Sequence, residues 1–270
     1  MTNDTDHPDA GFRRDIEAKL GEGMRLTRAD GIRLFDAEDL VWLGRMAHGA
    51  RSACHPDRVT FVHGDESTCP QRCAFCTESD GRWIAGTHVA SDDAWEAWST
   101  TRGDGRLAVA AVPVHHGEST TDRVDRLLRL RDLQDDGGGF IAVAPLRGEH
   151  PDGTGAMAQA AEALRAFAVA RLMIDNIDHV QSHWPSHGLD VAGLSLNFGA
   201  CDLSGSLTRY RTTHDTDLVD GELAQEDVVE LIQDAGFTPV HRDDVFGQVC
   251  EFDPPVPAAV RRAEPQKVWT

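Results

Sequence analysis

The chain has 270 residues, of which 45 are Asp or Glu and 26 are Lys or Arg, so its formal net charge at pH 7 is −19. Such an acidic surface repels nucleic acid, because phosphate binding requires clustered cations. The first residues are polar and acidic, and no stretch approaches about 18 consecutive apolar residues, so we expect a cytoplasmic protein with no signal peptide and no membrane span.

The lysine content is unusually low, since Lys19 and Lys267 are the only two lysines. This composition favours a halophilic protein, whose acidic surface stays solvated in a salty cytoplasm where counterions screen the self-repulsion. An acidic protein from a mesophile is the alternative interpretation.

Three helices are predicted in the first 57 residues. The first covers about residues 15–20, and the second and third begin near Thr27 and Asp36, which are residues that cap helices. Residues 58–63 then form a short apolar strand, and a loop with three cysteines follows its end.

Strands and helices alternate in the remainder of the chain. We expect helices over residues 91–98, 122–133, 157–174 and 225–234, and strands over residues 107–114, 140–144 and 191–198. Gly137, Gly138 and Gly139 follow the second of these helices and end it, so they are not a phosphate-binding loop.

This alternation is typical of an α/β fold with a parallel sheet. We count about five strands, whereas a closed (β/α) barrel of the TIM type has eight strands and about 250 residues. The sequence therefore predicts an incomplete barrel over residues 58–270, preceded by a helical segment at 1–57 within the same domain. We expect the N-terminal helices or a second subunit to cover the open side, because sheet edges do not stay unpaired.

Three of the six cysteines, Cys69, Cys73 and Cys76, follow a C-x3-C-x2-C spacing. Three thiolates from one tight loop can hold three irons of a 4Fe–4S cluster and leave the fourth iron without a protein ligand. Phe75 would shield the cluster from water. The other cysteines, Cys54, Cys201 and Cys250, are isolated in the sequence, and we expect them to be small buried residues.

A zinc site is the alternative, with His63, or Cys54 and His55, completing the coordination. Zinc sites usually combine a C-x2-C element with a second pair of Cys or His residues, and the sequence has no such second pair. The cluster is therefore the favoured interpretation.

The cysteine spacing, with an aromatic residue just before the last cysteine, resembles the signature of radical SAM proteins. The rest of the chain resembles one branch of them, which contains aminodeoxyfutalosine synthase, dehypoxanthine futalosine cyclase and the tyrosine-using subunit of deazaflavin (FO) synthase. The similar segments are residues 25–35, 39–44, 116–134, 138–140, 168–177 and 194–205.

The resemblance implies a TIM-type barrel that binds a 4Fe–4S cluster and S-adenosylmethionine. In the synthase, a 5′-deoxyadenosyl radical adds to an enolpyruvyl-benzoate and gives a menaquinone precursor with loss of carbon dioxide. A reduced ferredoxin or flavodoxin would supply the electron.

The sequence also departs from this branch. Between Trp98 and Leu107 the family has about a hundred more residues, or about three β-α units. That block carries the Gly-Gly segment expected to bind S-adenosylmethionine. Furthermore, Cys201 stands where the family usually has Asn.

Five further residues are candidates for the site because they match positions of the family. His116 and Glu118 follow a strand and could move a proton or bind a substrate carboxylate, and Asp202 is expected to follow the last strand. Asp175 and Asn176, at the end of a long helix, are candidates for cofactor binding, although helix capping and packing could also account for them.

Two other functions remain open. The chain could be a non-catalytic paralogue that binds a full-length partner across its open sheet edge, as a homo- or heterodimer. It could also catalyse a sibling reaction of the deazaflavin type on another small-molecule substrate.

Overall fold

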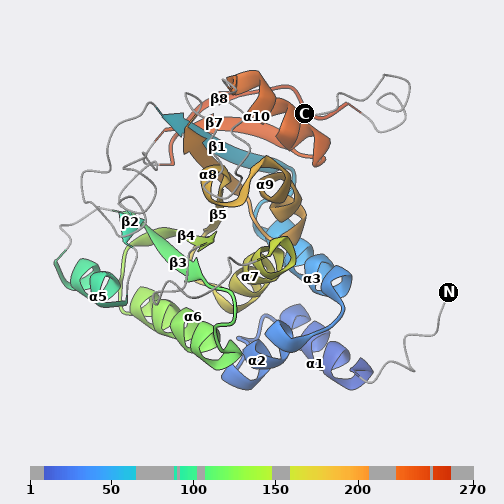
Figure 1. Cartoon of the computed structure of the whole chain (residues 1–270), viewed down its shortest axis with the longest axis vertical. Helices are drawn as coiled ribbons and strands as arrows, with labels where there is room; N and C mark the ends of the chain where they lie inside the picture. The colour runs from blue at the N-terminus through green and yellow to red at the C-terminus, as the bar shows by residue number, and fades with distance from the viewer. Residues whose placement is uncertain are drawn as a thin grey trace.

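The computed structural model describes residues 9–64, 88–89, 92–101, 107–147, 159–206, 223–243 and 246–256. In these residues the fold is α/β, with helices packed around one curved sheet (Figure 1). The helices are α1 (Ala10–Gly21), α2 (Arg28–Asp36), α3 (Leu40–Cys54), α5 (Asp92–Thr101), α6 (Thr120–Asp135), α7 (Ala160–Met173), α8 (Trp184–His187), α9 (Leu189–Ser195), the 3-10 turn η2 (Leu196–Phe198) and α10 (Gln225–Asp234).

The sheet has eight strands in the order β2-β3-β4-β5-β6-β1-β7-β8. All neighbouring pairs are parallel except β7 and β8, which are antiparallel. Within the described residues no pairing joins β2 to β8, so the sheet does not close, and the predicted incomplete α/β barrel is confirmed. The strands are β1 (Arg58–Gly64), β2 (His88–Val89), β3 (Ala108–Val114), β4 (Phe140–Arg147), β5 (His179–His183), β6 (Asp202–Ser206), β7 (Thr238–Arg242) and β8 (Gln248–Glu251).

Two sequence predictions about the strands are wrong. The count of about five was too low, because β2, β5, β6, β7 and β8 were missed. The strand expected over residues 191–198 is instead α9 followed by η2. Its apolar residues Val191, Ala192 and Leu196 are buried at the spacing of a helix, against the core of the neighbouring helices.

Helix starts follow the capping residues in the sequence. The Thr27 hydroxyl accepts a hydrogen bond from the Asp30 backbone N–H, and the Asp30 carboxylate accepts one from the Thr27 N–H. Asp39 caps α3 in a similar way. Helix α6 ends as expected: Gly137, just after its last turn, adopts a φ of 86°, a left-handed conformation that stops the helix.

The two faces of the sheet pack differently. On one face, alternate residues of β3 and β4 such as Ala110 and Val143 join a large apolar core with the helices. On the other face, Val109 and Ala144 belong to a small apolar cluster, against which Phe246 from the β7–β8 connection packs. The interior of the incomplete barrel is therefore partly filled by the C-terminal part of the chain.

The N-terminal helices and the C-terminal hairpin take different places around the sheet. α2 packs against α6 and α7, and α3 packs against α7, so the N-terminal helices extend the outer helical layer (Figure 1). Strand β1 is paired on both sides, with β6 and with β7. The C-terminal hairpin β7–β8 thus extends the sheet beyond β1, and in the described residues the sheet ends at β2 and β8. Cover of this gap by the N-terminal helices or a second subunit stays a prediction.

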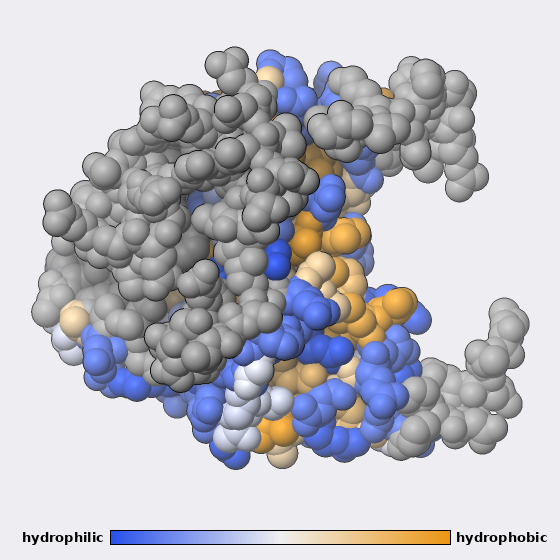
Figure 2. Space-filling model, viewed as in Figure 1, coloured by the Kyte–Doolittle hydropathy of each residue, from blue (hydrophilic) through white to orange (hydrophobic). Residues whose placement is uncertain are grey.

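No described helix combines the length and the hydropathy needed to cross a membrane. Hydrophilic side chains dominate the lower part of the view in Figure 2, over α1, α2 and α6. Hydrophobic side chains gather at its centre right, in the region of α3 and α9, where Val41 is 71% and Leu194 is 52% exposed.

Candidate active site at the carboxyl ends of the strands

The three cysteines of the predicted cluster, Cys69, Cys73 and Cys76, lie outside the described residues, as does Phe75. The last described residue before them is Gly64, at the carboxyl end of β1. The connections that follow the parallel strands β1, β3 and β4 leave the sheet at this same end, where (β/α) barrels bind their substrates.

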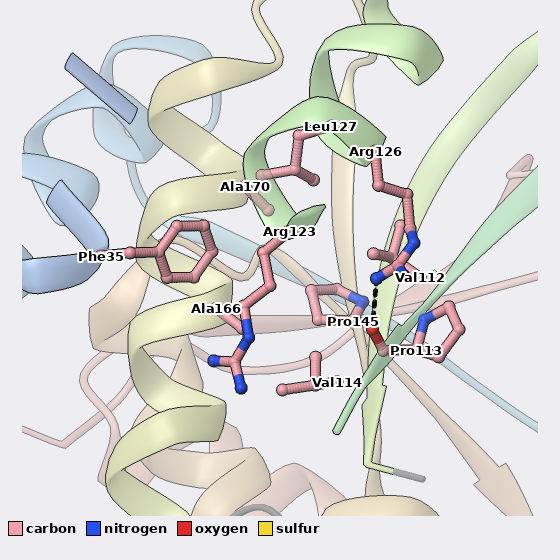
Figure 3. Close-up of a pocket in the computed structure, with 10 residues that line it drawn as sticks. All are labelled: Phe35, Val112, Pro113, Val114, Arg123, Arg126, Leu127, Pro145, Ala166 and Ala170. Carbon is pink, nitrogen blue, oxygen red and sulfur yellow. Dashed lines mark hydrogen bonds between the residues drawn. The ribbon is translucent and has the colours of Figure 1, made fainter. Parts of the chain in front are cut away.

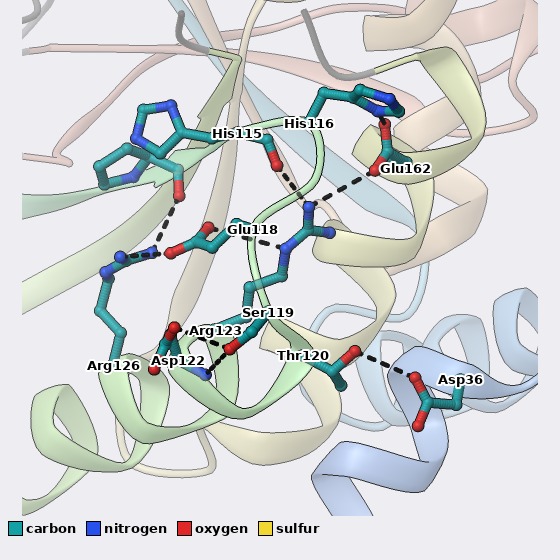
Figure 4. A network of polar contacts seen from close by, with 11 residues as sticks. Asp36, His115, His116, Glu118, Ser119, Thr120, Asp122, Arg123, Arg126 and Glu162 are labelled. Atoms are coloured by element: carbon teal, nitrogen blue, oxygen red, sulfur yellow. Dashed lines mark hydrogen bonds and ion pairs between the residues drawn. The ribbon is translucent and has the colours of Figure 1, made fainter. Parts of the chain in front are cut away.

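His116 and Glu118 lie in the short connection between β3 and α6, as the sequence predicts (Figure 4). Ser119 caps α6 by accepting a hydrogen bond from the Asp122 N–H, which fixes the point at which the connection turns into the helix. Thr120 donates a hydrogen bond to Asp36 and so links the start of α6 to α2. The connection is therefore held at both of its ends.

His116 is paired with a carboxylate from another helix. Its Nδ1 lies 2.7 Å from Oε2 of Glu162, in the first turn of α7, and Arg123 lies 3.4 Å from the other oxygen of Glu162. Burial alone would raise the pKa of Glu162, but the hydrogen bonds from His116 and from the Gln159 N–H outweigh it and the pKa is lowered. The His116 side chain is 43% exposed, so its second ring nitrogen can meet a ligand at this end of the sheet.

Glu118 is held by two arginines of α6. Arg126 donates to Oε1 of Glu118, while Nε of Arg123 lies 3.6 Å from Oε2. The Glu118 side chain is only 9% exposed. Because both cations neutralise this carboxylate, Glu118 is suited to positioning the connection and less suited to acting as a free base.

A small cavity lies below this network, between α2, α6, α7 and the strands β3 and β4 (Figure 3). Arg123 and Arg126 line it together with apolar residues such as Phe35 and Val114. Its volume of about 20 Å³ has room for about one water molecule, whereas small-molecule sites have about 300–1,000 Å³. This cavity is therefore not a substrate pocket.

Asp202 is not where the sequence predicted it. It is the first residue of β6, and it does not follow a strand. Its fully buried carboxylate accepts hydrogen bonds from Arg242, Gln181 and Thr60, on the three strands β7, β5 and β1. These contacts neutralise the charge and link the strands, which gives Asp202 a structural role in the geometry described.

Asp175 and Asn176 lie in the connection between α7 and β5, at the amino ends of the strands. Asp175 accepts a hydrogen bond from Arg25, and the Asn176 side-chain amide donates to Asp135 and to the Arg131 carbonyl. The structure thus separates both residues from His116 and Glu118, which lie at the opposite end of the sheet. These contacts hold the N-terminal segment and α6 together.

Among the candidate ligands of the alternative zinc site, His63 has other partners. His63 is hydrogen-bonded to Gln225 at 2.9 Å and stacks on His241. Cys54 and Cys250 are exposed, which corrects the expectation that both are buried. Cys54 is the last residue of α3, and Cys250 lies in β8, all four residues of which are exposed. Cys201 is buried as expected, but it is not isolated, since Arg171 donates to its sulfur.

Comparisons with known proteins decide the family. The family described as the CofH/MqnC C-terminal region matches residues 142–252. The chain is 30% identical to aminodeoxyfutalosine synthase of Streptomyces coelicolor over 386 aligned residues, which cover 96% of this chain and 100% of that protein. The chain belongs to the aminodeoxyfutalosine synthase family of radical SAM proteins. The alignment has 386 positions and the chain has 270 residues, so more than a hundred residues of the relative are aligned with gaps in this chain. The chain is therefore a shortened family member.

Two other relatives match parts of this family member. The cyclic dehypoxanthine futalosine synthase of S. coelicolor is 30% identical over 66% of this chain and 42% of its own length. The 5-amino-6-(D-ribitylamino)uracil–L-tyrosine 4-hydroxyphenyl transferase of Methanopyrus kandleri is 34% identical over 50% of this chain and 39% of its own length. The chain therefore spans less than half of these two relatives.

Among solved structures, the FeFe-hydrogenase maturase HydG from Carboxydothermus hydrogenoformans has a similar fold. Its TM-score is 0.56 at 12% identity, and the match covers 87% of this chain and 81% of that one. At this identity the similarity concerns the fold alone, and it agrees with the incomplete barrel seen here.

Sequence reasoning missed several residues of the polar networks, among them Glu162 and Arg242. Glu162 could have been found from the pair Gln159 and Glu162, whose spacing is typical of a capping box at a helix start. Arg242 ends β7, a short strand that follows the helix stop at Gly236. No local signal, however, shows that Arg242 meets Asp202.

Proposed function

We propose that the protein is a radical SAM enzyme of the aminodeoxyfutalosine synthase type, with Cys69, Cys73 and Cys76 holding a 4Fe–4S cluster and S-adenosylmethionine as co-substrate. The observation that carries this proposal is the similarity over the whole length of the S. coelicolor aminodeoxyfutalosine synthase. By that similarity, the substrate would be an enolpyruvyl-benzoate on the way to menaquinone, and a reduced ferredoxin or flavodoxin would be the electron donor.

The donor set supports the cluster. Three thiolates suit a cubane with one iron left open. The remaining cysteines cannot supply them, because Cys54 and Cys250 are exposed on separate elements and Cys201 is buried at the amino end of β6. When bound, the cluster and S-adenosylmethionine would supply the adenosyl radical, which is chemistry of the cofactor.

In this proposal the chain's own residues orient the substrate and handle a proton. Glu162 holds the Nδ1 side of His116, so that Nε2 can bind a substrate carboxylate or exchange a proton. Glu118, fixed by Arg123 and Arg126, keeps the connection that carries His116 in place. His116 is thus the proposed substrate-binding residue, and Glu118 and Glu162 are positioning residues.

A second candidate function is favoured by the missing block of more than a hundred residues and by the open sheet. The chain would then be an accessory paralogue that retains the cluster and binds a full-length relative. Such a protein would take up iron without cleaving S-adenosylmethionine at a useful rate.

Anaerobic reconstitution tests both candidates. We expect about four irons per chain, a brown colour, and reductant-dependent formation of 5′-deoxyadenosine and methionine. Cys73→Ala should lose the iron and the colour, whereas Cys250→Ser, which changes an exposed cysteine outside the loop, should keep both. Iron uptake without cleavage would favour the accessory candidate, and zinc in place of iron after anaerobic preparation would refute the cluster.

A further inference from the structure

Three potential metal ligands meet at the amino ends of the strands, the end of the sheet opposite to His116. His55 directly follows α3, His179 is the first residue of β5, and Cys201 immediately precedes β6. In the described part of the chain, these three offer donor atoms that all lie within 4.8 Å of one another. Three elements far apart in the sequence thus converge on one point.

The distances suit a tetrahedral metal. The Cys201 sulfur lies 3.5 Å from Nδ1 of His179. Zinc bonds of about 2.3 Å to sulfur and about 2.0–2.1 Å to nitrogen, at a tetrahedral angle, place these two atoms about 3.6 Å apart. The His55 and His179 rings stack with their centroids 4.8 Å apart, which brings the third donor to the same side.

The surroundings also suit a metal site. Nε2 of His55 lies 3.0 Å from the Asp178 carbonyl, a contact that fixes the ring, and the same side chain is hydrogen-bonded to Cys201. Metal-binding histidines commonly donate their other N–H to such a carbonyl. Arg171 donates to the Cys201 sulfur at 3.1 Å. Burial would raise the pKa of this thiol, but the two histidines and Arg171 lower it well below its usual value.

A metal ion could reach these three donor atoms from the surface. A cleft of about 440 Å³ lies at this end of the sheet, lined by His55, Cys54, Arg171 and residues of the N-terminal segment. His55 is partly exposed, and it lines the cleft as well as being one of the three donors, whereas Cys201 is buried. A metal ion can therefore reach the three donors past His55.

We propose that His55, His179 and Cys201 form a zinc site at the amino ends of the strands, with a water molecule as the fourth ligand. Neutral imidazole and thiolate are the ligands that zinc prefers in proteins. The ion would join the end of α3 to β5 and β6 and so stabilise this end of the sheet. None of its three ligands belongs to the cysteine loop, and the proposal does not depend on the proposed radical function.

The experiment uses the full-length, untagged chain with Cys69, Cys73 and Cys76 changed to alanine, so that the loop cannot bind metal. After exposure to zinc and removal of the excess, elemental analysis should find about one zinc ion per chain. Cys201→Ser in this background should lose the ion. Cys54→Ser and Cys250→Ser, which change exposed cysteines, should keep it.

X-ray absorption at the zinc edge, measured on the same triple alanine variant, identifies the ligand atoms. In this variant the zinc ion should have one sulfur neighbour at about 2.3 Å together with nitrogen or oxygen neighbours at about 2.0–2.1 Å. Absence of bound zinc, equal zinc in the Cys201→Ser variant, or a zinc shell without sulfur would each overturn the proposal.

Discussion

Arg242 and Asp202 form a doubly hydrogen-bonded ion pair inside the protein, with 2.6 Å between Nε and Oδ1 and 2.7 Å between Nη2 and Oδ2. Both side chains are fully buried. The pair connects β7 to β6 across β1, which lies between them in the sheet. It therefore fixes the C-terminal hairpin on the strand that leads to the cysteine loop.

Removing one partner of this pair should destabilise the protein strongly. Asp202→Ala leaves the Arg242 guanidinium buried without a counter-charge, and such changes cost about 3–5 kcal/mol of the free energy of unfolding. Denaturant unfolding measures this. As a matched control, Arg58→Ala removes an exposed pair with Glu251 and should cost at most about 1 kcal/mol. An Asp202→Ala protein of normal stability but without activity would instead support the catalytic role that the sequence suggested.

The contact between His116 and Glu162 should make stability depend on pH. The pKa of Glu162 is lowered in the folded state from its ordinary 4.5, so the stabilisation is present above pH 4.5 and is lost as the pH falls through the lower folded-state pKa. At neutral pH, Glu162→Gln should therefore lower the free energy of unfolding by about 1 kcal/mol. Unfolding curves of both proteins between neutral and acidic pH should converge at the acidic end.

The control for this measurement is Glu38→Gln, which changes an exposed carboxylate in the turn before α3. Its effect should be small and should show no such convergence. If Glu162→Gln behaves like Glu38→Gln at every pH, the contact with His116 does not stabilise the protein.

The charge of the chain should make its stability depend on salt. With 45 acidic residues and a net charge of −19, self-repulsion opposes the compact state, and counterions screen it. Between dilute buffer and molar potassium chloride we expect Tm to rise by at least about 4 °C, which corresponds to about 1 kcal/mol or more in a chain of this size. Differential scanning calorimetry measures this, with an equal osmolarity of sucrose as the uncharged control. A Tm that does not change with salt would contradict the halophilic interpretation.

Loss of the C-terminal hairpin should make the chain associate. A chain that ends at residue 237 lacks β7 and β8, so one edge of β1 becomes an unpaired parallel edge. Unpaired edges recruit strands from other molecules, and light scattering at high salt should detect oligomers or aggregates. A chain that ends at residue 256 keeps the hairpin and serves as the control. If the chain that keeps the hairpin forms oligomers of the same size as the shortened chain, the hairpin is not what prevents association.

Apolar patterns in the sequence predict the strands that face the helices. Strands β3 and β4 are apolar on both faces, and both were predicted. β5 and β6 were missed because one face of each carries polar residues toward the interior, such as Gln181 and Asp202, which leaves only Val180 and Leu203 as an apolar signal. A short run of this kind does not separate a strand from a turn.

The site was predictable only where local sequence decides it. His116 and Glu118 follow a clear strand, and their position in the connection after it is confirmed. The meeting of His55, His179 and Cys201 depends on how β5 and β6 are ordered in the sheet and on where α3 ends, and residue spacing carries no information on that arrangement.

The pairing of β1 also has a consequence for biosynthesis. Both neighbours of β1, the strands β6 and β7, come from residues after 201, whereas β1 itself ends at residue 64. During translation β1 therefore leaves the ribosome long before any strand that can pair with it, and its native contacts are among the most distant in the sequence. The segment with the three cysteines directly follows β1, so its attachment to a finished sheet waits until nearly the whole polypeptide has been synthesised.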